Sequence, residues 1–147
     1  MPATRTAPPT AELAHELRET IGRLVRRLRQ ETTPPTPPAP QLAVLGRLDR
    51  DGTASISDLA AAERMRPQSM AQTVHDLEAA GLVSRRPDPD DRRRFFVELT
   101  RAGRALLRAT RARREGWLTE ALERELSTDE RAALARAVAL LDRVADA

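Results

Sequence analysis

The sequence predicts a mainly α-helical fold that carries one small β-hairpin, so it falls in the α+β class. In several stretches apolar residues recur every three or four positions, which is the period of an amphipathic helix. Residues 82–99 instead alternate apolar and polar side chains on either side of the turn-forming segment PDPDD, which is typical of two paired strands. With 147 residues, 40% of them hydrophobic, the chain is long enough for one ordinary folded domain with helical extensions.

The composition excludes several classes of site. The chain has no Cys, which removes disulfides, thiol chemistry and thiolate zinc sites, and His15 and His75 are too few for a His-rich metal site. There is no Gly-rich phosphate loop and no nucleophile–base pair of recognisable spacing, so we expect neither an enzyme nor a cofactor. No apolar run approaches ~18 residues, and the first ten residues lack the apolar core of a secretory signal. We therefore expect a cytoplasmic protein without a membrane span.

The first forty residues divide into three parts. Residues 1–10 hold three prolines among small polar residues and are predicted to be a disordered arm. Residues 11–30 carry an apolar stripe at helical spacing and predict an amphipathic helix. Five prolines between 34 and 40 then favour an extended path, which we interpret as a stiff loop between helices rather than as a Pro-rich ligand for a recognition domain.

Two short helices are expected next. Residues 41–50 predict a helix with Leu42, Leu45 and Leu48 on its apolar face, ended by Asp51-Gly52. Ile56 is expected in a brief extended stretch. Ser57 is a good N-cap for the following helix, SDLAAAER, whose Leu59 and Ala60 would face inward.

A third helix and the hairpin follow. Pro67 opens a helix over residues 67–80, and Gly81 supplies its stop. Residues 82–86 and 93–100 predict the two strands, and in the second strand Phe95, Val97 and Leu99 share one face.

Two long helices complete the chain. Thr100 can cap a helix over residues 101–125, and Ser127 with Glu130 has the spacing of a capping box for a helix over residues 128–145. The apolar surface of these helices and of helix 11–30 exceeds what a core of about 60 residues could cover. We therefore expect residues 11–40 and 101–147 to form a dimerisation region.

From residue 41 to 100 the order is helix, short strand, helix, turn, helix, hairpin. This order predicts a winged helix-turn-helix, a DNA-binding domain whose helix 67–80 reads bases and whose hairpin is the wing. Residues 64–114 carry 13 Arg and 6 acidic residues, a net charge of +7, whereas the other residues carry 12 Arg and 16 acidic residues, a net charge of −4. Phosphate-binding surfaces concentrate charge in this way, so the distribution favours nucleic acid as the partner.

Helical geometry identifies the exposed face of the reading helix. At 100° per residue, Met70, Val74 and Leu77 lie within about 60° of one another and form the buried stripe. The opposite face presents polar side chains of the kind that pair with base edges or phosphate in a major groove. These side chains are Gln68, Ser69 and Gln72, with Thr73 at the edge.

The hairpin turn is the sharper signal. Arg92, Arg93 and Arg94 lie at or just past its tip, where Asp90 or Asp91 can fix one guanidinium by a charge-assisted bond. An Arg held out at a hairpin tip suits the negative potential of a narrow minor groove.

The segment RPQSMAQTVHDLEAAGLVSRRPDPDDRRRFFVELTRAGRALL resembles the MarR family of bacterial transcription regulators. The matching pieces are the end of the reading helix at 77–83, the Asp-x-Arg signature at 91–93, and Leu99-Thr100 at the start of a long helix. The resemblance implies a wing-tip Arg93, or Arg92 beside it, oriented by Asp91. It also implies reader contacts from Arg66, Gln68, Ser69, Gln72 and Thr73, and phosphate contacts from Arg85 and Arg86.

The resulting functional prediction is a homodimeric transcriptional regulator, a repressor, that binds a pseudo-palindromic operator in double-stranded DNA. Helix 67–80 would enter the major groove and the wing, residues 87–95, the minor groove. The resemblance implies a small lipophilic effector between the dimer helices and the winged domain, although with only Phe95, Phe96 and Trp117 as aromatic residues a flat aromatic ligand is not favoured. The alternative is a winged helix that contacts other proteins in a regulatory complex without reading DNA.

Overall fold

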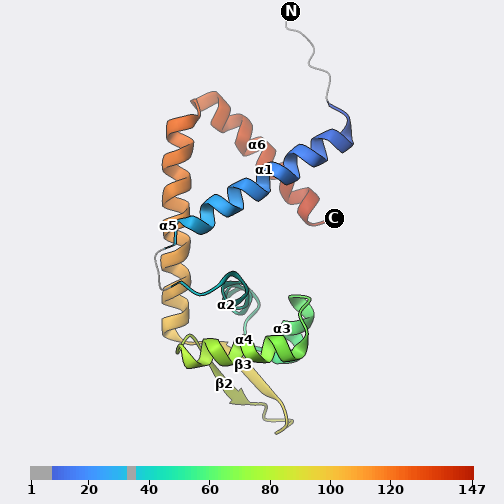
Figure 1. The fold of residues 1–147 in the computed structure, drawn as a ribbon, viewed down its shortest axis with the longest axis vertical. Coiled ribbons are helices and arrows are strands. Elements are labelled where there is room, and N and C mark those ends of the chain that lie inside the picture. Colours follow the sequence, from blue (N-terminus) through green and yellow to red (C-terminus); the bar gives the residue numbers. More distant parts are fainter. Residues whose placement is uncertain (1–7, 33–35) are drawn as a thin grey trace, which may run out of the picture. The chain divides into compact units, whose positions relative to one another are not determined.

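The computed structural model describes residues 8–32 and 36–147, and these form two compact units. Of the described residues, 36–112 form one unit and 8–32 with 113–147 form the other; we call them the central unit and the terminal unit. Residues 1–7 of the predicted arm therefore lie outside the described residues, as do residues 33–35 of the Pro-rich loop, and Thr10, predicted as part of the arm, is helical. Helix α5, Arg101–Glu125, contributes residues to both units (Figure 1).

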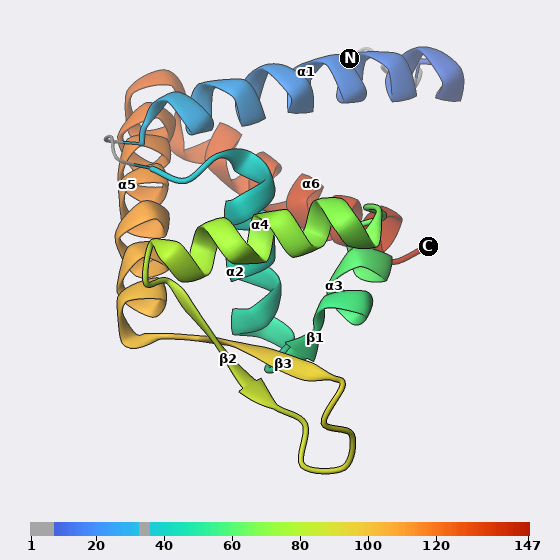
Figure 2. The ribbon, with the colours of Figure 1, turned by 60° about the horizontal axis from the view of Figure 1, so that its bottom comes forward.

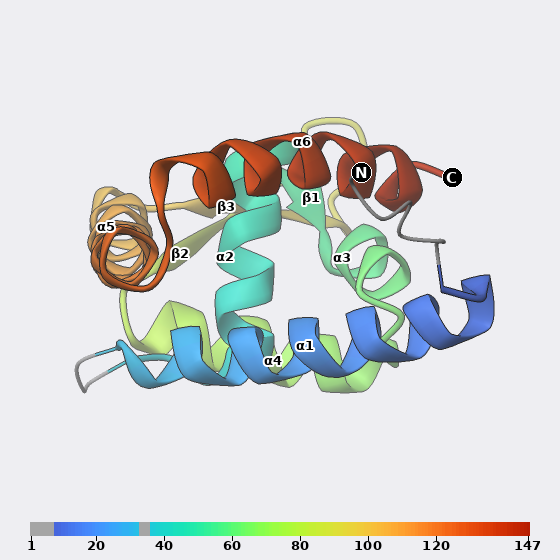
Figure 3. The same cartoon turned by 90° about the horizontal axis from the view of Figure 1, so that it is seen from above.

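The central unit has the element order expected of a winged helix-turn-helix. Its helices are α2 (Ala39–Asp51), α3 (Ile56–Ala62), α4 (Pro67–Ala79) and the first half of α5. Its strands, β1 (Ala54–Ser55), β2 (Val83–Pro87) and β3 (Phe95–Leu99), form an antiparallel sheet in the order β1-β3-β2. Helix α2 lies between α3 and α5 (Figures 2 and 3).

The core of the central unit is apolar and contiguous. The predicted inward residues of α3 and α4 are buried, and Val44 of α2, which the spacing argument left out, is also fully buried. Phe95 is 44% exposed although it shares a strand face with Val97 and Leu99, because it lies at the end of β3 nearest the turn. The fully buried large side chains are Leu45, Leu59, Met70, Leu77, Val44, Val74 and Val97.

Two predicted helix starts were wrong. The N-cap of α3 is Ser55, not Ser57, and Ile56 is its first helical residue rather than part of a strand. Ser55 is the N-cap because it forms a capping box with Asp58. The Ser55 hydroxyl accepts a hydrogen bond from the Asp58 amide (3.1 Å), and the Asp58 carboxylate accepts one from the Ser55 amide (3.4 Å). Pro40 belongs to the first turn of α2, where its missing N–H has no intrahelical acceptor to lose.

Two glycines end helices as predicted. Gly52 (φ +83°) follows α2 and Gly81 (φ +74°) follows α4, both in the left-handed region that favours glycine. Thr100 also caps α5 as predicted, because its Oγ1 accepts from the Gly103 amide (3.1 Å). The same hydroxyl donates to the Gly81 carbonyl (2.6 Å), and this joins the start of α5 to the end of the reading helix.

The terminal unit consists of α1 (Thr10–Gln30), the second half of α5 and α6 (Thr128–Ala145). The Ser127–Glu130 capping box forms as predicted, and α1 starts one residue earlier than expected. Neither α1 nor α6 buries a single residue within this chain. Their large exposed apolar side chains are Leu13, Ile21, Leu24, Val25, Leu134, Val138, Leu140 and Val144.

Candidate nucleic-acid interface

The polar face of α4 is open to solvent. Gln68, Ser69 and Gln72 are exposed, whereas the opposite stripe of the helix is buried. The Gln72 Nε2 donates to Asp76 Oδ1 (2.8 Å), which leaves the amide oxygen and a second N–H of Gln72 available. Thr73 is half-buried and its hydroxyl donates to the Ser69 carbonyl (3.0 Å), so it is the least available of the predicted reader residues.

Arg66 occupies the N-cap of the same helix. Its backbone is extended (φ −68°, ψ 142°) and Pro67 follows it inside the first turn. Arg66 is exposed at the end of a helix whose first amides have no intrahelical acceptor. A guanidinium and free amides at one helix N-terminus can together bind a phosphate.

The hairpin turn between β2 and β3 is held by its own backbone and two Asp side chains. The Asp88 amide donates to the Arg94 carbonyl and the Arg94 amide to the Asp91 carbonyl, both at 2.9 Å. The Asp91 carboxylate accepts from the Arg93 amide (2.9 Å), so Asp91 positions Arg93 through its main chain and not, as the charge-assisted pairing assumed, through its guanidinium. Asp88 similarly accepts from the Asp90 amide (2.8 Å).

The arginines of the hairpin fall into two groups. Arg92 and Arg93 are exposed at the turn, and no ion pair within residues 8–32 and 36–147 involves them. The side chains of three others are engaged within the central unit: Arg85 with Glu78 (3.0 Å), Arg86 with Glu98 (3.4 Å) and Arg94 with Asp58 (3.0 Å). The guanidiniums of Arg86 and Arg94 also lie over the Phe96 ring, at 5.4 and 5.6 Å from its centroid.

Sequence reasoning missed Ser55 and Asp58 as partners of the wing. The Arg94 Nη2 donates to Asp58 Oδ2 and also to Ser55 Oγ (3.2 Å). Hydrogen bonding from the Ser55 side chain, aided by the Ser55 amide and by the charge of Arg94, lowers the pKa of Asp58 despite some desolvation. The Ser-x-x-Asp spacing at 55–58 was the available signal for the cap, but no local pattern points from it to Arg94.

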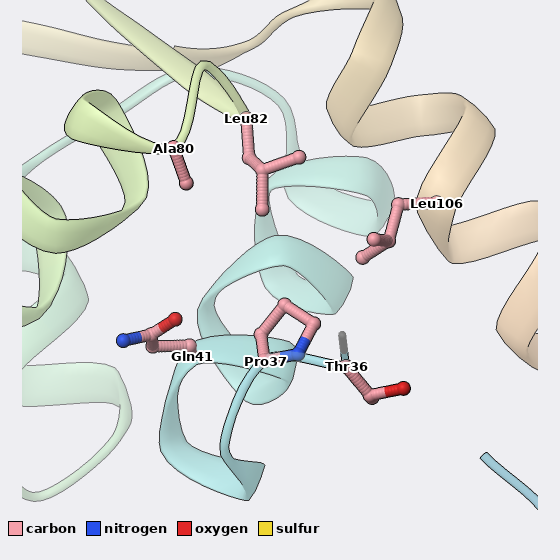
Figure 4. A pocket seen from close by; sticks show the side chains of 6 residues that line it. All are labelled: Thr36, Pro37, Gln41, Ala80, Leu82 and Leu106. Carbon is pink, nitrogen blue, oxygen red and sulfur yellow. The ribbon is translucent and has the colours of Figure 1, made fainter. Parts of the chain in front are cut away.

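A cavity of about 300 Å³ lies between the start of α2, the α4–β2 connection and α5 (Figure 4). Its walls are mostly apolar, and none of its lining residues carries a charge. They are Thr36, Pro37, Gln41, Ala80, Leu82 and Leu106.

The described residues offer neither a metal centre nor a membrane-spanning helix. No group of three His, Asp or Glu side chains there could hold a metal ion, and no helix there is long and apolar enough to cross a membrane.

A model of the MarR family matches residues 38–95, which include the reading helix and the wing. An HTH-type transcriptional regulator of Mycobacterium leprae is 35% identical over 136 residues, covering 92% of this chain and 94% of that protein. The chain belongs to the MarR family. As a MarR family protein it is a transcriptional regulator with a winged helix-turn-helix, and not an enzyme.

Solved structures agree with this assignment. A Pseudomonas aeruginosa protein described as a transcriptional regulator is 43% identical, with a TM-score of 0.83 over 94% of this MarR family chain and 98% of its own. Bordetella bronchiseptica BpsR, a protein whose DNA binding is regulated by 6-hydroxynicotinic acid, is 27% identical to this chain in sequence. Its structure matches this one with a TM-score of 0.63. That match covers 89% of this chain and 98% of BpsR.

Proposed function

We propose that this MarR family regulator binds a pseudo-palindromic operator in double-stranded DNA as a homodimer, with α4 in the major groove and the hairpin turn in the minor groove. The observation that carries the proposal is that two features occur in the same unit. One is a face of α4 that exposes amide and hydroxyl side chains, and the other is a pair of guanidiniums at the hairpin turn that form no ion pair with any described residue. Gln68, Ser69 and Gln72 supply the groups that pair with base edges. Arg92 and Arg93 supply positive charge at a hairpin tip, which suits a narrow minor groove.

The proposed homodimer uses the terminal unit. Helices α1 and α6 bury no residue within the chain. Accordingly, the Leu13 residue of α1 is 50% exposed and the Val144 residue of α6 is 67% exposed. Exposed apolar stripes on two long helices are typical of surfaces that a partner covers. A two-fold dimer would present two copies of α4 to one face of DNA, with half-sites about one helical turn, ~34 Å, apart.

The proposed mode of regulation is repression relieved by a small lipophilic molecule. Support for a ligand comes from BpsR, whose DNA binding is regulated by 6-hydroxynicotinic acid. The uncharged lining of the α2–α4–α5 cavity favours a neutral lipophile over an anionic one. Ala80 and Leu82 line the cavity and join α4 to β2, so a ligand there would act on the connection between reader and wing.

Selection of binding sites from a random duplex pool tests the proposed function. The wild-type protein should enrich a motif with two-fold symmetry, and the bound complex should contain two chains per duplex by sedimentation. A panel of neutral lipophiles and apolar acids, titrated into that complex, tests release. Enrichment of no motif would contradict DNA reading and favour the alternative of a winged helix that contacts only other proteins.

A further inference from the structure

Arg94 makes two hydrogen bonds that tie the hairpin turn to the start of α3, and it also lies over a ring of its own strand. Its Nη2 donates to Asp58 Oδ2 (3.0 Å) and to Ser55 Oγ (3.2 Å), and its guanidinium lies 5.6 Å from the centroid of Phe96. Ser55 and Asp58 are 39 and 36 residues away in sequence. The contacts therefore bridge two parts of the unit that no local interaction would join.

The two groups that accept hydrogen bonds from Arg94, on Ser55 and Asp58, are held in place by other contacts. Ser55 is 3% exposed and belongs to β1, which pairs with β3 through Ser55 opposite Phe96. Asp58 is held by the capping box of α3. Because the groups that receive the guanidinium are rigid, the bond restrains the hairpin turn and not the helix. Helix α3 leads into α4, so the restraint acts between the wing and the reading helix.

We propose that Arg94 is a positioning residue that fixes the wing relative to the helix-turn-helix, and not a phosphate ligand like Arg92 and Arg93. This inference rests on the proposed DNA binding. Three adjacent arginines would then have different roles, with Arg92 and Arg93 contacting DNA and Arg94 holding the wing in place. A wing that is already restrained loses less conformational freedom when it enters the groove, which strengthens DNA binding without a contact of its own.

Whether Asp58→Asn strengthens or weakens DNA binding shows whether Arg94 binds phosphate or positions the wing. If Arg94 were a phosphate ligand, removing its competing carboxylate would free it for DNA and strengthen binding. If Arg94 positions the wing, neutralising the carboxylate weakens the bond that restrains the wing and so weakens DNA binding. Asp58 Oδ2 accepts from both the Ser55 amide and Arg94, and the single side-chain oxygen of Asn can take its place, so the α3 cap survives while the charge that attracts Arg94 is lost.

The experiment compares Asp58→Asn, Arg94→Gln and the wild type for binding to the selected duplex across a range of salt concentrations. Both variants should bind roughly two- to fivefold more weakly, the range of a half-exposed ion pair, and the double variant should lose no more than either single one. The slope of log K against log salt should stay unchanged, whereas loss of a phosphate ligand makes it shallower by about 0.9 for each wing of the dimer. Asp90→Asn is the matched control, since it removes the same charge from the exposed turn and should bind no more weakly than the wild type.

A second readout requires no DNA. The Asp88 amide donates to the Arg94 carbonyl and the Arg94 amide to the Asp91 carbonyl, so both amides report the order of the turn by hydrogen exchange. They should exchange roughly two- to fivefold faster in Asp58→Asn and Arg94→Gln, and unchanged in Asp90→Asn. Tighter DNA binding by Asp58→Asn, or unchanged exchange in both variants, would overturn the proposal. Failure of the wild type to bind any duplex would instead refute the proposed function, and the exchange rates would still decide the role of Arg94.

Discussion

At Gly103 the first turn of α5 closely approaches Leu82, in the connection between α4 and β2. Gly103 is buried in that turn, and a Cβ built there would lie 2.1 Å from the Leu82 carbonyl oxygen and 3.2 Å from Leu99 Cδ2. The Leu82 carbonyl also accepts from the Thr100 amide (3.1 Å). Gly103→Ala therefore places a methyl group against backbone that is already hydrogen-bonded and has no flexible side chain to move aside.

The expected effect is opposite in sign to that of an ordinary glycine substitution in a helix. Gly→Ala at an open helical position stabilises by about 0.5–1 kcal/mol through helix propensity. At Gly103 overpacking costs about 1–3 kcal/mol, and displacing Leu82 weakens a backbone hydrogen bond worth about 0.5–1.5 kcal/mol. We therefore expect a net loss of about 0.5–4 kcal/mol in the free energy of unfolding.

Urea unfolding of the full chain, followed by helical circular dichroism, measures this difference. Gly46→Ala is the matched control in the same unit, because a Cβ at Gly46 would meet only the far end of the Arg50 side chain, at 3.4 Å. Gly46→Ala should be neutral or stabilising, and Gly103→Ala should unfold at distinctly lower urea. Equal midpoints for Gly103→Ala and the wild type would show that α5 does not dock against Leu82 as described.

Three further predictions follow from the same geometry. Gln72→Ala should alter the selected motif at one base pair per half-site, at about 1–3 kcal/mol, while Arg66→Ala should weaken all duplexes evenly; an unchanged Gln72→Ala motif would remove Gln72 from the reader. Deletion of residues 127–147 should give a monomer or an aggregate by analytical ultracentrifugation, because it removes the α6 part of the proposed interface and leaves the exposed apolar stripe of α1 without it, and a well-folded dimer would count against that interface. Folding lowers the pKa of Asp58, so the ionised carboxylate contributes stability above about pH 4, and this contribution is lost as the pH falls through the lowered pKa. Asp58→Asn removes this titrating group, so the Tm of that variant should decline less steeply below about pH 4 than the Tm of the wild type.

Most elements of the fold could be predicted because their signals are local. The buried stripe of α4, the stop at Gly81 and the Ser127–Glu130 cap each depend on residues within a few positions of one another. Ser55 and Ser57 show the limit of this reasoning, because both have the chemistry of an N-cap. The capping box that Ser55 forms with Asp58 decides between them, and pairing of Ser55 with Phe96 in the sheet, 41 residues along the chain, holds Ser55 in the extended conformation of an N-cap.

The candidate site could be predicted by residue type but not by role. Arg92, Arg93 and Arg94 are adjacent and identical, so sequence alone gives all three the same function. The structure separates them because Arg94 has acceptors in β1 and α3, and such contacts depend on the tertiary fold. Gly103 is similar, since a glycine inside a helical pattern does not reveal which backbone approaches it.

The central claim is that Arg93 at the wing tip and the face of α4 bind duplex DNA directly. The most direct test is the salt dependence of affinity of wild type and Arg93→Ala for the selected duplex. Arg93→Ala should bind more weakly, with a slope of log K against log salt that is shallower by about 0.9 for each phosphate no longer neutralised, counted over both wings of the dimer. Wild-type affinity and an unchanged slope for Arg93→Ala would contradict the central claim.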